Sequence, residues 1–238
     1  MKKVIAYSLF QSEPDNIDRF WDKDQDKGFD RYLWNIDAIL LVNKVVYPDF
    51  ETRIYIPKGL EQLECLLKYD CLVPIDIIEK PINYQAKLFR LLPLWEKEVR
   101  WLFCRDIDSL PNEQEIRASY LFMQTRAVAQ GIRSHKYHGG LDHSLLGGLS
   151  AYNVIKMKKL GYLKNTFYDL IEKAINIDPE MKWNIDQNTI TWFFLSQRGF
   201  AERILQTNLN NSPLELGLNR IRFPAEDYNN IDLSFINP

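Results

Sequence analysis

The chain of 238 residues contains little cysteine and no long apolar run. Its three cysteines, Cys65, Cys71 and Cys104, are an odd number and form no Cys-x-x-Cys pair, so the sequence predicts no disulfide framework and favours a reducing compartment. The longest apolar candidate, residues 38–46, is far shorter than the ~18 residues of a membrane-spanning helix. The apolar run after Met1 is too short for a signal peptide. We therefore expect a cytoplasmic protein. These features are also compatible with peripheral contact with a membrane surface.

An excess of charge of one sign is also missing. The 30 basic and 32 acidic residues give a net charge of −2, so no global field attracts nucleic acid or an anionic membrane. Two nucleotide-binding motifs are absent as well: no Gly-x-Gly-x-x-Gly follows the first expected strand, and there is no phosphate loop with Gly-Lys-Ser/Thr. Any nucleotide must be held in another way.

Apolar residues are plentiful, at 46% of the chain, and their spacing alternates between strand and helix patterns. This alternation in the first half predicts a parallel sheet with crossover helices, within one α/β domain. The expected strands are residues 4–10, 52–57, 72–79 and 100–106, and the expected helices between them are 32–47, 59–69 and 84–99. In the more irregular second half, the expected helices are 113–130, 152–159, 165–175 and 186–197.

Residues 101–104 form a short apolar run that suits a strand covered on both faces. Asp106 and Asp108 follow this run, and Pro111 then stops the strand. Residues two apart in extended backbone project to the same side, so the two carboxylates repel each other unless a cation lies between them. Mg²⁺ and Mn²⁺ bind one or two carboxylates together with substrate phosphates. At the carboxyl end of a strand, where ligands lie in open α/β sheets, the pair indicates a metal-bridged phosphate site. The alternative is a plain turn.

Two further polar pairs point to a charged ligand or a sugar. Lys87 and Arg90 share one face of the helix before this strand and are placed to neutralise a diphosphate, although a solvated basic face is the default. Asp186 and Gln187 open a later apolar helix. They suit either an N-cap or a polar site that binds sugar hydroxyls.

Residues 131–150 hold all three histidines, His135, His138 and His143, and two Gly-Gly pairs. Such a cluster could bind zinc, but the histidine spacing fits no common structural zinc site. A simpler interpretation is that one of these histidines contacts a metal, a phosphate or an acceptor. Gly147 and Gly148 mark backbone that needs unusual torsions or approaches a ligand closely, with simple turns as the alternative.

Together these pieces resemble the nucleotide-diphospho-sugar transferases of GT-A fold, in which a basic helix leads into a strand ending in Asp-x-Asp. The Arg-Asp-x-Asp-Ser form is similar to a bacterial and phage group of sugar transferases, and the Asp-Gln pair to that of galactosyltransferase-like members. The resemblance spans residues 84–194 and rests on Ala86-Lys87-Leu88, Leu91-Leu92-Pro93-Leu94, Phe103-Cys104-Arg105-Asp106-Ile107-Asp108-Ser109, His138, Gly147-Gly148 and Asp186-Gln187.

The resemblance implies a Rossmann-type mixed sheet flanked by helices, in a single GT-A-like domain over 1–238 with a more irregular C-terminal lobe. Residues 1–110 would be the nucleotide-binding half and 111–238 the acceptor and catalytic half. The residues that it implies are Tyr7, Ser8, Lys87, Arg90, Arg105, His138, Gly147 and Gly148 for substrate binding, Asp106 and Asp108 for Mn²⁺ or Mg²⁺, and Asp186 and Gln187 for catalysis beside the sugar.

The implied activity is transfer of a sugar from a nucleotide-sugar donor to a glycan or lipid-linked glycan acceptor. Many relatives take a third metal ligand from a late histidine, and none follows His143 here, so His138, Glu226, Asp227 or water would replace it. Two alternatives stay open. One is a nucleotidyltransferase or another metal-dependent phosphate enzyme, although a Gly-rich basic loop after the first strand is missing. The other is a non-catalytic sugar-binding protein on the same fold.

Overall fold

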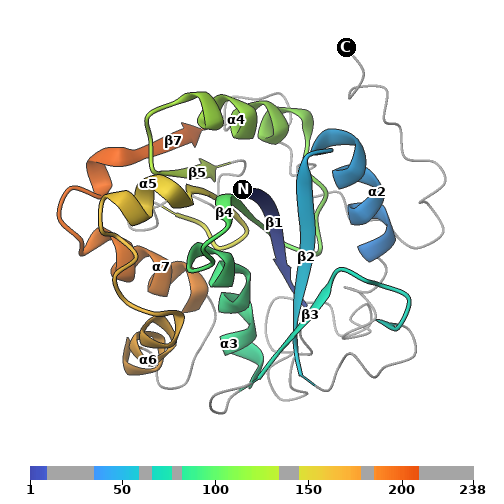
Figure 1. The fold of residues 1–238 in the computed structure, drawn as a ribbon, viewed down its shortest axis with the longest axis horizontal. Helices are drawn as coiled ribbons and strands as arrows, with labels where there is room; N and C mark the ends of the chain where they lie inside the picture. The colour runs from blue at the N-terminus through green and yellow to red at the C-terminus, as the bar shows by residue number, and fades with distance from the viewer. Residues whose placement is uncertain (10–34, 59–65, 77–81, 134–144, 178–184, 209–238) are drawn as a thin grey trace.

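The computed structural model describes residues 1–9, 35–58, 66–76, 82–133, 145–177 and 185–208 (Figure 1). Within these ranges, seven strands form one sheet in the order β3-β2-β1-β4-β6-β5-β7. The strands are β1 Lys2–Ser8, β2 Phe50–Pro57, β3 Leu72–Ile75, β4 Val99–Arg105, β5 Ala129–Arg133, β6 Leu149–Asn153 and β7 Ile204–Asn208. The predicted α/β fold with a mixed sheet is confirmed.

The first half of the chain supplies the parallel part of the sheet. Strand β1 pairs in parallel with β2 and β4, and β2 pairs in parallel with β3, as the alternation of strand and helix predicts. Strand β6 runs antiparallel to both β4 and β5, while β5 and β7 are parallel. The carboxyl ends of β1 and β4 therefore meet at one edge, where ligands lie in open α/β sheets.

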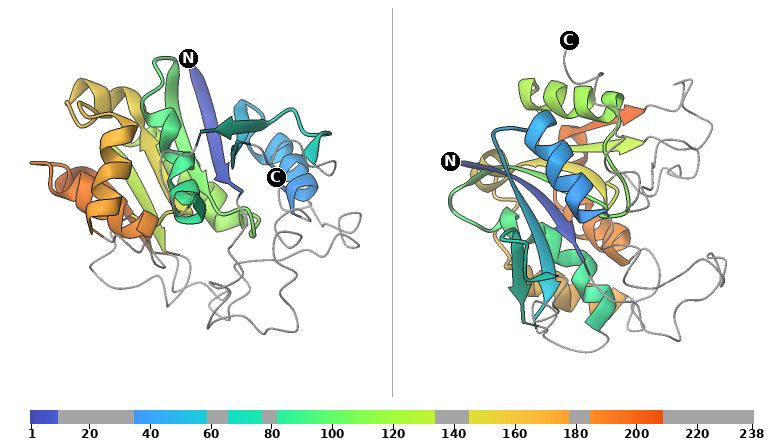
Figure 2. Two further views of the ribbon diagram at one scale, coloured as in Figure 1. Left: turned by 90° about the horizontal axis from the view of Figure 1, so that it is seen from below. Right: turned by 90° about the vertical axis from the view of Figure 1, so that its right-hand side faces the viewer.

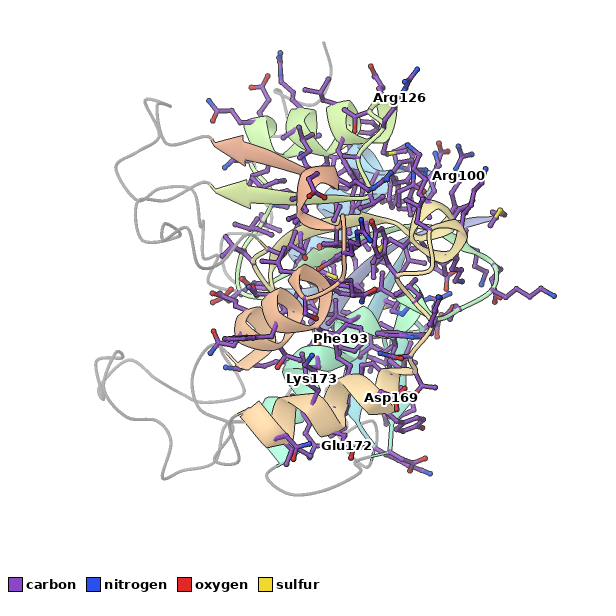
Figure 3. All side chains as sticks on the ribbon, turned by 90° about the vertical axis from the view of Figure 1, so that its left-hand side faces the viewer. Arg100, Arg126, Asp169, Glu172, Lys173 and Phe193 are labelled. Carbon is purple, nitrogen blue, oxygen red and sulfur yellow. The ribbon has the colours of Figure 1, made fainter. Side chains whose placement is uncertain are left out.

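Helices cover both faces of the sheet (Figure 2). The first face carries α2 Ile36–Val46 and α4 Glu113–Gln124. The second face carries α3 Ile82–Leu88, the 3₁₀ helix η4 Phe89–Leu94, α5 Val154–Lys159, α6 Phe167–Ile177 and α7 Ile185–Leu195. On this face α6 and α7 lie side by side, with the Lys173 ammonium 5.9 Å from the Phe193 ring centroid (Figure 3).

Strand β4 shows why both faces are buried. Its side chains alternate, so that Leu102 and Cys104 pack under α3 and α7 while Trp101 and Phe103 pack under α2 and α4. All four are at most 3% exposed. A continuous apolar run is what a strand covered on both faces requires.

Several expected helices end earlier than the apolar spacing suggests. The helix expected over 84–99 divides into α3 and η4 and stops at Leu94. Pro93 lies in its last turn and has no N–H to continue an α-helix. The helix expected over 113–130 ends at Gln124, where the Thr125 hydroxyl donates to the Phe122 carbonyl.

Three strands of the second half were not predicted. Residues 129–133 form β5 instead of the end of a helix, residues 149–153 form β6, and a helix begins only at Val154. Strand β7 was also missed; the short 3₁₀ helix η6, Ala201–Arg203, precedes it. The helix expected over 59–69 lies mostly outside the described residues. Of the helices that the structure describes, none has the length and apolar character needed to cross a membrane.

Candidate functional site

Arg90 joins two carboxylates that come from different parts of the chain. Its Nη1 donates to Asp106 Oδ1 at 2.8 Å, and its Nη2 donates to Asp186 Oδ2 at 2.6 Å. Asp106 directly follows β4, and Asp186 lies in the first turn of α7. We call Arg90, Asp106 and Asp186 the Arg90 cluster. It lies at the carboxyl end of the central strand.

The guanidinium of Arg90 is held by backbone as well as by carboxylates. Its Nε donates to the Lys87 carbonyl at 3.1 Å, and Nη1 also donates to the Arg105 carbonyl at 3.1 Å. Burial by itself would lower the pKa of Arg90, but Asp106 and Asp186 raise this pKa above its ordinary value. The buried group is therefore charged and fixed in orientation.

Ser8 connects the end of β1 to the same place. Its hydroxyl accepts a hydrogen bond from the Arg90 backbone N–H at 3.2 Å and donates to the Lys87 carbonyl at 3.4 Å. Ser8 thus ties the last residue of β1 to the junction between α3 and η4. Ser8, which was predicted as a substrate-binding residue, therefore lies next to the Arg90 cluster.

Lys87 adds a second cation to this end of the sheet. Its side chain is half-buried, and burial lowers its pKa, with Arg90 lowering it further and Asp186 and Asp106 opposing the shift. These influences show that the ammonium lies within electrostatic reach of all three members of the Arg90 cluster. The structure therefore brings Lys87 and Arg90 together with Asp106 and Asp186.

Gly147 and Gly148, just before β6, leave room for the two carboxylates. A Cβ built on Gly147 would lie 1.9 Å from Asp186 Oδ2, and one on Gly148 would lie 2.0 Å from the Asp106 Cγ. Each glycine therefore sits against one carboxylate of the Arg90 cluster. Close approach of backbone to a polar group explains this Gly-Gly pair better than a simple turn does.

We expect Gly148→Ala to lower the free energy of unfolding by about 1–3 kcal/mol, because the new methyl overlaps the Asp106 carboxylate. Urea denaturation of the wild type and the variant measures this change. The double variant Gly148→Ala with Asp106→Ala removes the overlapping carboxylate and serves as the matched control. It should lose less stability than the sum of the two single variants. Strict additivity would contradict the proposed overlap.

Tyr7 and Arg105, both predicted as substrate-binding residues, lie away from the Arg90 cluster. Tyr7 is fully buried, and its hydroxyl pairs with the Asn43 side chain on α2. Burial raises the pKa of Tyr7. Arg105 is 3% exposed and bonds to Ser119 on α4. Because strand side chains alternate, Tyr7 and Arg105 face α2 and α4, whereas their neighbours Ser8 and Asp106 face η4.

Asp108 and Gln187 are both half-buried. In the sequence, Asp108 follows Asp106 by two residues and Gln187 directly follows Asp186. Asp186 is the second residue of α7 rather than its N-cap, and its Oδ2 accepts from Arg90. His138 lies outside the described residues, as do the other two histidines and the proposed alternatives for a third metal ligand, Glu226 and Asp227.

Two residues near the Arg90 cluster, Tyr152 and Cys104, were not predicted as site residues. Tyr152 on β6 is fully buried, and burial raises its pKa, with Cys104 adding to the shift and Arg90 opposing it. Burial likewise raises the pKa of Cys104 to about 12, and the Cys104 Sγ donates to the Arg90 carbonyl at 3.6 Å. Recognising residues 149–153 as a strand would have placed Tyr152 on the same face as Cys104.

The donor chemistry of the site suits a hard divalent cation that is shared with a ligand. The described residues contain no group of three or more Asp, Glu, His or Cys side chains arranged to hold a metal alone. Asp106 accepts from Arg90 through Oδ1, and a carboxylate offers about four lone-pair positions, so it can accept from Arg90 and bind a cation as well. Asp106, and Asp108 in the turn after β4, thus offer the kind of oxygen donors that Mg²⁺ or Mn²⁺ binds together with phosphate oxygens.

No family model matches the chain, and no curated protein matches it in sequence. Among solved structures, the 4-diphosphocytidyl-2C-methyl-D-erythritol synthase of Anaerococcus prevotii DSM 20548 has a TM-score of 0.47 at 12% identity, over 95% of this chain and 93% of that one. The galactosyltransferase LgtC in complex with donor and acceptor sugar analogs has a TM-score of 0.47 at 11% identity, over 93% and 84%. An active-site mutant of LgtC gives 0.47 at 10% identity, over 93% and 85%. At this distance the likeness identifies no function.

Proposed function

We propose that the protein is a metal-dependent glycosyltransferase that moves a sugar from a nucleotide-diphosphate donor to a glycan or lipid-linked glycan. The observation that carries the proposal is the double ion pair of Arg90, at 2.8 Å to Asp106 and 2.6 Å to Asp186. It joins the Asp-x-Asp strand to the Asp-Gln helix at one edge of the sheet. The resemblance in the sequence implies the same combination of residues.

The charge of the site favours a cation followed by an anionic ligand. Lys87 and Arg90 supply two positive charges, while Asp106, Asp108 and Asp186 supply three negative charges, which leaves −1. A divalent cation reverses this to +1, and a diphosphate then becomes the favoured partner. Because all five of these groups are at least half-buried, water screens their interactions less than it would at the surface.

Each group would then have a defined task. Asp106 and Asp108 would hold Mn²⁺ or Mg²⁺, which as a Lewis acid stabilises the charge of the departing nucleoside diphosphate. Lys87 and Arg90 would orient the diphosphate and the donor sugar, and Asp186 and Gln187 would lie beside the reacting sugar. Ser8 would lie near the nucleotide, at the carboxyl end of β1.

Calorimetric titration with UDP and GDP, each with and without Mn²⁺, tests the proposal. We expect one of the two nucleotides to bind only when Mn²⁺ is present, since the diphosphate would otherwise meet unneutralised carboxylates. Binding that is independent of the metal would give the Asp pair another task and contradict the metal role. Metal-dependent binding of nucleoside triphosphates alone would favour a nucleotidyltransferase, and no binding at all would favour a non-catalytic sugar-binding protein.

A further inference from the structure

Arg105 immediately precedes Asp106, yet its side chain lies on the other face of the sheet. It is 3% exposed, its Nη2 donates to Ser119 Oγ at 2.8 Å, and its Nη1 donates to the Cys104 carbonyl at 3.0 Å. Ser119 in turn donates to the Glu115 carbonyl at 2.8 Å, one turn earlier in α4. Arg105 thereby links the last residue of β4 to the interior of α4.

The surroundings of Arg105 hold its charge in one place. The guanidinium lies 5.7 Å from the Phe103 ring centroid, and Glu115 nearby is itself only 3% exposed. Burial by itself would lower the pKa of Arg105, but Tyr47 and Glu115 raise it above its ordinary value. A buried charge without its partners is strongly unfavourable, so the guanidinium has little freedom to leave this position.

The segment that carries Asp106 and Asp108 is tied to α4 at its other end as well. Asn112 and Glu115 form a capping box, with Asn112 Oδ1 accepting from the Glu115 N–H at 2.9 Å and Glu115 Oε2 accepting from the Asn112 N–H at 3.4 Å. Between the two ties, Ile107 is 4% exposed and packs into the core beneath α2 and α4. The turn bearing the two carboxylates is therefore fixed on both sides.

We propose that Arg105 is a positioning residue that orients Asp106 and Asp108 for the metal by tying the end of β4 to α4, without contacting the substrate. The inference rests on the metal role in the proposed function. Arg90 fixes the Asp106 carboxylate from one face of the sheet, while Arg105 fixes the Asp106 backbone from the other. Together they pre-organise the pair of carboxylates before a ligand arrives.

The test compares Arg105→Met and Ser119→Ala with the matched control Arg53→Met. Arg53 is also a buried arginine, at 8% exposure, but its ion pairs are with Glu51 and Glu96, which both precede β4 in the chain. Mn²⁺ affinity is measured at one fixed concentration of the nucleoside diphosphate that the wild type binds, and the affinity for UDP or GDP is measured at saturating Mn²⁺. Urea denaturation records the stability of each variant.

We expect Arg105→Met to weaken Mn²⁺ binding by about tenfold or more, and Ser119→Ala to weaken it by a smaller factor. Nucleotide affinity at saturating Mn²⁺ should stay within about twofold of the wild type, since neither side chain would touch the donor. Arg53→Met should lose stability and keep its Mn²⁺ affinity. This pattern separates positioning from a general loss of stability.

Two results would overturn the inference. Unchanged Mn²⁺ affinity in a folded Arg105→Met variant would leave Arg105 a purely structural role, and a large loss of nucleotide affinity at saturating Mn²⁺ would make it a substrate contact. If Arg105→Met does not fold, Ser119→Ala decides, because it removes only one hydroxyl. Absence of Mn²⁺-dependent nucleotide binding in the wild type would refute the proposed function itself, and that result is seen before any variant is compared.

Discussion

Replacing Asp106 by asparagine is expected to lower sugar transfer by about 10²–10³-fold or more, because the metal loses an anionic ligand at the departing diphosphate. Release of nucleoside diphosphate from a panel of UDP- and GDP-sugars measures the loss. The same variant should also lose Mn²⁺-dependent nucleotide binding. The fold should persist, since asparagine keeps the Oδ1 that accepts from Arg90 at 2.8 Å.

Asp37→Asn is the matched control for this substitution. Asp37 is an exposed residue of α2 that pairs with Lys68 at 3.0 Å, and surface ion pairs of this kind contribute little to stability. The control should retain the activity and nucleotide binding of the wild type. Full activity in a folded Asp106→Asn variant would remove the metal role from the proposed function.

The second large effect is expected from Arg90→Met, which should lower the free energy of unfolding by about 3–5 kcal/mol. The substitution leaves the carboxylates of Asp106 and Asp186 without their shared cation, and the Asp186 side chain is only 9% exposed. Urea denaturation measures the change. The free energy of unfolding of Arg90→Lys should lie between those of the wild type and Arg90→Met. An ammonium keeps the charge but does not reproduce the planar guanidinium that reaches both carboxylates.

Arg117→Met provides the comparison at the surface. Arg117 pairs with Glu113 on the exposed side of α4, and its side chain is 78% exposed. Removing a screened pair should change the free energy of unfolding by no more than about 0.5 kcal/mol. A loss in Arg90→Met no greater than that in Arg117→Met would show that Arg90 does not hold the two carboxylates in solution.

The end of the central strand illustrates how far a sequence pattern reaches. The apolar run before Asp106 and the proline after Asp108 were sufficient to predict a buried strand that ends at the carboxyl edge beside Asp106. The extended backbone expected through Asp108 is instead a turn at residues 107–108. The same pattern of alternation places Arg105 with Phe103, on the face opposite Asp106. That alternation, which is available in the sequence, separates Arg105 from Asp106 although both were predicted for one site.

Strands β5 and β7 show where local patterns stop being informative. Each has five residues. Strand β7 begins at Ile204 and is stabilised by pairing with β5, which ends far earlier in the chain at Arg133. Nothing within five residues distinguishes such a segment from the end of a helix or a loop. Pairing with a distant strand decides its conformation.

The sequence by itself determined the α/β class, the parallel first half of the sheet and the presence of carboxylates and cations at its carboxyl edge. Backbone periodicity is local, so the order of residues is enough to set which side chains share a face. Only the tertiary structure decided that Arg90 would join Asp106 to Asp186, which lies 96 positions from Arg90, and that each of two glycines would make room for one carboxylate. Such contacts depend on how strands pair and helices pack across the whole sheet, which no local pattern encodes.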